Sequence, residues 1–83
     1  MDLYLGIDVG SVSTNLVIID EKNEVIAYEY LRTRGQPIRA VQEGLKAIAQ
    51  KIPQGGSICG VGTTGSARYL TGVIVGADTV KNE

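Results

Sequence analysis

The sequence predicts an α/β fold in which three antiparallel strands are followed by a helix and a parallel fourth strand. Three observations support this class. Apolar residues alternate over positions 3–9, two further short apolar runs follow, and apolar residues then recur every three or four positions over 38–52. A period of two is typical of strands, and a spacing of three to four is typical of an amphipathic helix.

Residues 3–31 (Leu3 to Leu31) are expected to form an antiparallel meander. The first strand has apolar residues on one face: Leu3, Leu5, Ile7 and Val9. The continuous apolar run at 16–19 suits a strand buried on both faces. A polar turn at 20–23 leads into a third strand at 25–31, with Tyr28 and Tyr30 on one face. Short turns between successive strands favour antiparallel pairing.

A helix is expected from Pro37 to Ile52, because proline suits the first turn and Pro53 cannot continue the helix. Its predicted apolar stripe comprises Ile38, Val41, Leu45, Ile48, Ala49 and Ile52. Residues 57–62 (Ser57 to Gly62) predict a fourth strand, and a right-handed crossover makes it parallel to the first. The predicted strand order is 3-2-1-4. Residues 63–83 (Thr63 to Glu83) form a tail in which 67–70 could begin a short helix.

Composition limits the class of protein. The chain has 83 residues, a net charge of −1, one cysteine and no histidine. This length predicts one small domain. A single cysteine cannot form an internal disulfide, which fits a cytoplasmic location. The near-neutral charge argues against nucleic-acid binding, and no apolar run approaches the roughly 18 residues of a membrane span. A zinc site made by this chain alone is also disfavoured.

A candidate phosphate site follows the first strand. Asp8 lies near the end of that strand, and the turn after it consists mostly of small residues: Gly10, Ser11, Val12, Ser13 and Thr14. Backbone amides in such a turn can bind phosphate oxygens. A neighbouring carboxylate can hold Mg²⁺ through water, and the ion can bridge to the phosphates. The stretch therefore predicts a nucleotide-phosphate hairpin, and the alternative is a polar turn with a solvated Asp8.

The motif Asp8-Val9-Gly10-Ser11 between two apolar strands resembles the first phosphate motif of the actin, sugar-kinase and heat-shock-seventy ATPase superfamily. The ribonuclease-H-like half-domain of that superfamily begins with the same order of elements. The segments YLGIDVGSVSTNLVIID and GVGTTGSARYLTGVIVGADTVKNE together resemble the BadF/BadG/BcrA/BcrD family. Members of this family are ATP-dependent activators of 2-hydroxyacyl-CoA dehydratases and benzoyl-CoA reductases.

The resemblance implies a set of roles. Asp8 is the catalytic, metal-side carboxylate for Mg-ATP, residues 10–14 bind phosphates, and Thr64 and Gly65 belong to a second motif at the same cleft. Family members are homodimers that share one [4Fe–4S] cluster and pass an electron to a dehydratase or reductase partner. The cluster ligands and the second phosphate motif would lie downstream of Glu83. The chain is therefore expected to be an N-terminal fragment that does not hydrolyse ATP alone.

Two residues depart from the family pattern, and the first of them, Asn15, leaves room for a second interpretation. Asn15 occupies a position where many superfamily members have a lysine or arginine, and Ala67 stands where small activators commonly have glycine. Asn15 cannot supply a positive charge to the phosphates. The alternative function is a non-catalytic ribonuclease-H-like assembly module within a large multi-domain protein.

Three further features have simpler interpretations. Residues 60–65 match a dinucleotide-binding G-x-G-x-x-G pattern, but no substantial helix follows, so a close-packed loop lining the nucleotide cleft is expected. Cys59 lies within the fourth strand, where a buried cysteine is expected to act as a small hydrophobe rather than a cluster ligand. Arg32, Arg34 and Arg39 surround a bend and are expected to form a solvated edge, with an acidic partner or CoA phosphates as the alternative.

Overall fold

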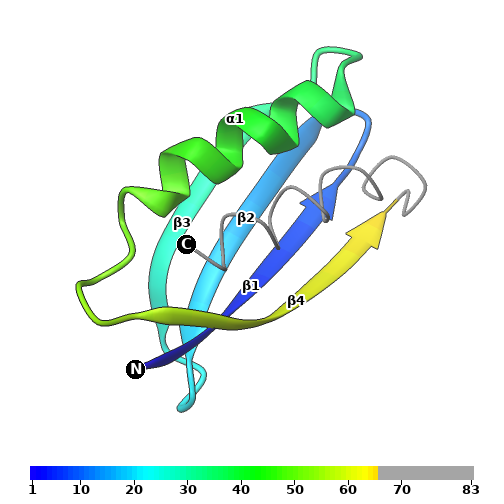
Figure 1. Cartoon of the computed structure of the whole chain (residues 1–83). Coiled ribbons are helices and arrows are strands. Elements are labelled where there is room, and N and C mark those ends of the chain that lie inside the picture. The colour runs from blue at the N-terminus through cyan, green and yellow to red at the C-terminus, as the bar shows by residue number, and fades with distance from the viewer. Residues whose placement is uncertain (66–83) are drawn as a thin grey trace.

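A computed structural model describes residues 1–65 of the chain. The elements are β1 (Asp2–Val9), β2 (Ser13–Asp20), β3 (Val25–Arg32), α1 (Pro37–Ala49) and β4 (Ser57–Gly65). They form one mixed sheet of order β3-β2-β1-β4, in which β1 is antiparallel to β2 and parallel to β4. Helix α1 lies across one face of this sheet (Figure 1). The predicted α/β class and strand order are confirmed, and the short helix expected at 67–70 lies outside the described residues.

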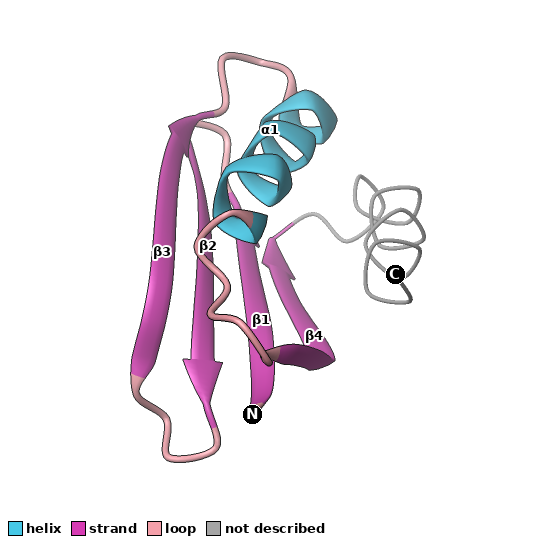
Figure 2. Ribbon diagram, turned by 60° about the vertical axis from the view of Figure 1, so that its left-hand side comes forward, coloured by secondary structure: helices cyan, strands magenta, loops and turns pink. Residues whose placement is uncertain are grey.

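The core lies between α1 and the sheet face beneath it. The four alternating apolar residues of β1 are all buried, as predicted: Leu3, Leu5, Ile7 and Val9. In β2, Leu16 and Ile18 are fully buried, whereas Val17 and Ile19 are only half-buried. The expectation that β2 is buried on both faces is therefore met on one face only. The reason is that α1 lies on one side of the sheet (Figure 2).

The bounds and the buried face of α1 differ from the prediction. The helix begins at Pro37 as expected but ends at Ala49, not at Ile52. Its buried residues are Ala40, Val41, Gly44 and Ile48. Ile38 is 45% exposed and Ala49 is exposed, because both lie about 100° around the helix axis from the centre of the buried face. In the described part of the chain, no helix is long and apolar enough to cross a membrane.

Gly44 lets α1 approach the sheet closely. A Cβ atom on Gly44 would lie 2.5 Å from Leu16 Cδ1 and 2.9 Å from Leu31 Cδ1. Any side chain here would overlap two residues of the core. Glycine lowers helix propensity, so its place in the middle of α1 reflects packing against β2 and β3 rather than a local preference.

Strand β4 corrects two predictions. It continues to Gly65, three residues beyond the predicted end, so residues 60–65 form an extended strand and not a loop. The pairing of β4 with β1 shifts between Leu3, which faces Ile58, and Tyr4, which faces Gly60. Cys59 is the extra residue of this bulge, and it is exposed. The prediction that Cys59 is a core residue is therefore wrong.

Candidate functional site

The structure brings Asp8 and Thr64 together at the carboxyl ends of two parallel strands. The two residues face each other across β1 and β4, and Thr64 Oγ1 donates a hydrogen bond of 2.7 Å to Asp8 Oδ1. Both side chains are exposed, and Gly65 pairs with Val9 one step further along. Two of the predicted site residues, 56 positions apart in sequence, are thus in direct contact. This contact lies beside the turn that joins β1 to β2.

The turn at residues 10–13 has two backbone donors at its tip that engage no acceptor among the described residues. Gly10 N donates to Ser13 O at 2.9 Å and closes the turn. Ser11 and Val12 form the tip, and the Val12 residue is 70% exposed. Within residues 1–65 the amides of Ser11 and Val12 donate to no backbone carbonyl. Such paired, unengaged amides can bind an anion.

Thr14 is not at the exposed tip. Its side chain is fully buried, and its Oγ1 lies 3.0 Å from Thr33 Oγ1. Thr33 Oγ1 donates its one proton to Gly10 O at 2.8 Å. A hydroxyl has a single proton, so Thr14 must be the donor within the threonine pair. The Thr14 hydroxyl therefore supports the turn from beneath and does not face solvent, although the sequence placed it among the phosphate-binding residues.

Thr33 is a site residue that the sequence did not reveal. Besides its hydroxyl bond to Gly10 O, its backbone N donates to Val12 O at 2.9 Å. Both bonds join the segment after β3 to the turn after β1, and Thr33 is itself buried. A lone threonine after a strand has no distinguishing pattern, and its partners are 19 or more positions away, so sequence spacing gave no signal.

Asn15 is engaged on the sheet face that points away from α1, here called the outer face. Its Nδ2 donates to Ser13 Oγ at 3.3 Å, and its Oδ1 accepts a 2.6 Å hydrogen bond from Tyr28 OH. The side chain thereby links β2 to the edge strand β3. Asn15 makes a structural contact beside the turn but brings no positive charge to it.

A magnesium ion held through water is compatible with these residues. Among residues 1–65 there is no group of three His, Cys, Asp or Glu side chains that could enclose a metal ion. Mg²⁺ commonly retains several waters and binds one or two carboxylates together with substrate phosphates. A single exposed carboxylate at Asp8 fits that mode. One carboxylate would be too few ligands for a metal ion bound by protein side chains alone.

Comparisons of the chain with protein-family models, with curated proteins and with solved structures found no match. The support for a function therefore comes from the Asp8–Thr64 contact, the exposed turn at residues 10–13 and the motifs that these residues belong to.

Proposed function

We propose that this chain is the N-terminal phosphate-binding part of an ATP-dependent activator that drives low-potential electron transfer to a 2-hydroxyacyl-CoA dehydratase or a benzoyl-CoA reductase. The observation that supports it best is the Asp8–Thr64 hydrogen bond beside a turn whose two tip amides have no acceptor within residues 1–65. The strand order and the crossover helix are those expected of a ribonuclease-H-like half-domain. A cytoplasmic location and a homodimeric parent protein come with the same proposal.

Each residue has a distinct role in this proposal. Asp8 holds Mg²⁺ through water, because a carboxylate placed directly on a phosphate would be repelled by it. The amides of Ser11 and Val12 donate to phosphate oxygens, and Thr64 orients the Asp8 carboxylate. The metal supplies charge neutralisation for the phosphates. Thr33 holds the turn in shape from the core side.

The iron–sulfur part of the proposal does not rest on the described residues. Residues 1–65 contain one thiol, Cys59, and it lies at the β4 bulge near the amino end of that strand. A [4Fe–4S] cluster is held by cysteine thiolates, commonly four. The described residues therefore do not fit a cluster, and its ligands would have to come from elsewhere in the parent protein.

Substitution of Asp8 tests the proposal in the longer parent protein that contains this segment. Asp8→Asn keeps the size of the side chain and should lower Mg-ATP hydrolysis by about 10- to 100-fold, as when groups outside the first ligand shell of a metal are removed. Asp2→Asn is the matched control, because Asp2 is an exposed acid at the other end of the same strand. Equal hydrolysis rates in wild-type and Asp8→Asn protein, with circular dichroism unchanged, would contradict the proposed role.

One observation favours the alternative of a non-catalytic assembly module. The outer face has exposed aromatic residues, Tyr28 and Tyr30, and Asn15 is hydrogen-bonded to Tyr28 rather than free to approach the turn. Exposed aromatic residues are common at protein interfaces. A wild-type parent protein that binds its neighbours but does not hydrolyse ATP would favour this second function.

A further inference from the structure

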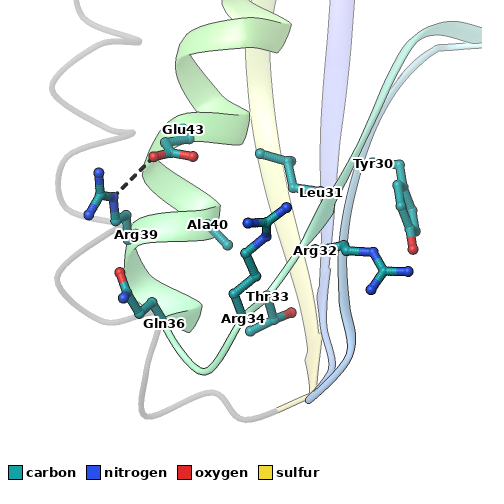
Figure 3. A pocket seen from close by; sticks show the side chains of 9 residues that line it. All are labelled: Tyr30, Leu31, Arg32, Thr33, Arg34, Gln36, Arg39, Ala40 and Glu43. Carbon is teal, nitrogen blue, oxygen red and sulfur yellow. Dashed lines mark hydrogen bonds and ion pairs between the residues drawn. The ribbon is translucent and has the colours of Figure 1, made fainter.

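A hollow of about 600 Å³ lies beside the end of β3 and the first turns of α1. The lining residues that matter for its chemistry are Arg32, Thr33, Arg34, Gln36, Arg39 and Glu43. None of residues 8–14 lines it, although one lining residue, Thr33, is hydrogen-bonded to Gly10 and Val12 of the turn beside Asp8. Arg34 extends into the space between β3 and α1, whereas Arg32 lies on the other side of β3 with Tyr30 (Figure 3).

The hollow has an excess of positive charge. Three arginines line it against a single carboxylate, Glu43. That carboxylate is already engaged, since Arg39 Nε lies 3.1 Å from Glu43 Oε1. Arg32 and Arg34 form no ion pair with any other residue in the range 1–65. Two exposed guanidinium groups therefore remain without a charged partner in the described part of the chain.

The amino-terminal end of α1 adds to the positive electrostatic potential of the hollow. Its N-cap residue, Gln36, makes no side-chain capping bond, and the first turn contains no acidic residue. The positive end of the helix dipole is therefore not neutralised locally. Guanidinium groups bind phosphate oxygens in pairs and are preferred where phosphate recognition needs geometry as well as charge.

We propose that this hollow is a binding site for a small polyphosphate, a ligand with a chain of two or more linked phosphate groups. The volume falls within the range of about 300–1,000 Å³ that is typical of small-molecule sites. Arg32 and Arg34 lie on opposite sides of the edge strand (Figure 3). A linked chain of phosphates has more oxygens, spread over a greater length, than a single phosphate and is therefore better suited to contact both.

Calorimetric titration of the 83-residue chain with sodium tripolyphosphate tests the proposal. The buffer contains EDTA and little salt, since screening weakens contacts of exposed charges. Tripolyphosphate should bind more tightly than orthophosphate. Removing one guanidinium, by Arg34→Gln or separately by Arg32→Gln, should weaken binding by about tenfold, the effect of losing a hydrogen bond to a charged group. Lys46→Gln is the matched control, because Lys46 is an exposed cation of α1 outside the hollow.

Asp8→Asn separates this site from the proposed ATP site. It should leave tripolyphosphate affinity unchanged, and amide shifts in NMR spectra should centre on residues 33–40. A parallel titration with metal-free ATP identifies the source of the phosphate chain. If ATP binds with the same affinity as tripolyphosphate, the hollow recognises the phosphate chain alone and the ligand is an inorganic polyphosphate. If ATP binds more tightly, the ligand is a nucleotide.

Three results would overturn the proposal. The first is no binding of tripolyphosphate, or binding that neither arginine substitution weakens. The second is a set of amide shifts centred on residues 8–14 instead of residues 33–40. The third is binding of a hexaglutamate peptide without binding of tripolyphosphate, which would assign the hollow to an acidic protein partner instead.

Discussion

Thr33 is the residue on which the shape of the candidate turn most depends. Its Oγ1 donates a hydrogen bond to Gly10 O, and its backbone N donates one to Val12 O. The same Oγ1 accepts a hydrogen bond from the buried Thr14 hydroxyl. The hydrogen bonds run in one direction, from Thr14 through Thr33 to the Gly10 carbonyl. A buried hydroxyl that loses its acceptor costs more free energy than the bond itself contributed.

Replacing Thr33 by valine tests this chain of hydrogen bonds. Thr33→Val keeps the shape of the side chain but leaves both the Thr14 hydroxyl and the Gly10 carbonyl without their partner. We expect the free energy of unfolding to fall by about 1–3 kcal/mol, measured by urea denaturation. Thr33→Ser retains the hydroxyl and should lose less. Identical urea midpoints for Thr33→Val and wild type would show that the buried bonds do not hold the turn.

Helix α1 shows what sequence periodicity can and cannot determine about an element. The spacing of Val41, Leu45 and Ile48 correctly predicts that a helix forms and that it covers the sheet. It does not reveal Gly44, whose importance comes from Leu16 and Leu31 on other elements. It also assigns Ile38 to the buried face, because periodicity gives the direction of a stripe but not its exact centre.

Substitution of Gly44 by alanine tests the close approach of α1 to the sheet. Alanine should gain about 1 kcal/mol in helix propensity. The added methyl group meets Leu16 and Leu31 in a filled core, where overpacking costs about 1–3 kcal/mol. We therefore expect Gly44→Ala to unfold at a lower urea concentration than wild type, whereas Gln42→Ala, on the exposed side of α1, should not.

A double-mutant cycle sharpens the Gly44 test. In a Leu16→Ala background the closer of the two clashes is removed and the approach to Leu31 Cδ1 remains, so Gly44→Ala should destabilise the chain less than it does in the wild type. Coupling between two residues in contact is typically about 0.5–3 kcal/mol. If Gly44→Ala raises stability in the wild-type background, or if the two changes are additive, the packing account of α1 is wrong.

At the scale of the whole molecule, local hydrophobic patterns in the sequence predicted the sheet, whereas the candidate site is formed by contacts between residues far apart in sequence. The alternation in β1 and the crossover through α1 suffice to predict the strand order, because burial on one face and the handedness of crossovers are general constraints. The same topology places Thr64 beside Asp8, so this pair was foreseeable as members of one cleft. Neither the role of Thr33 nor the bulge at Cys59 was foreseeable. The first depends on hydrogen bonds between segments far apart in sequence, and the second depends on the register of β4 on β1.

Asp8 and a group of three other acids lie at opposite ends of the sheet. Asp8 lies at the end where β1 leads into the turn, and the β2–β3 turn at the other end contains Asp20, Glu21 and Glu24. The Asp20 carboxylate is occupied by the amides of Lys22 and Glu24. These acids provide an internal comparison for any measurement of where a metal–nucleotide complex binds.

Paramagnetic broadening by Mn²⁺-ATP is the most direct test of the central claim that the turn beside Asp8 binds a metal–phosphate complex. The chain alone should bind nucleotide weakly, and this method detects weakly populated complexes. Trace Mn²⁺-ATP should broaden the amide signals of Ser11, Val12 and Thr64 before those of residues 20–24, and Asp8→Asn should abolish the difference. Broadening that begins at residues 20–24, or that is unaffected by Asp8→Asn, would contradict the account.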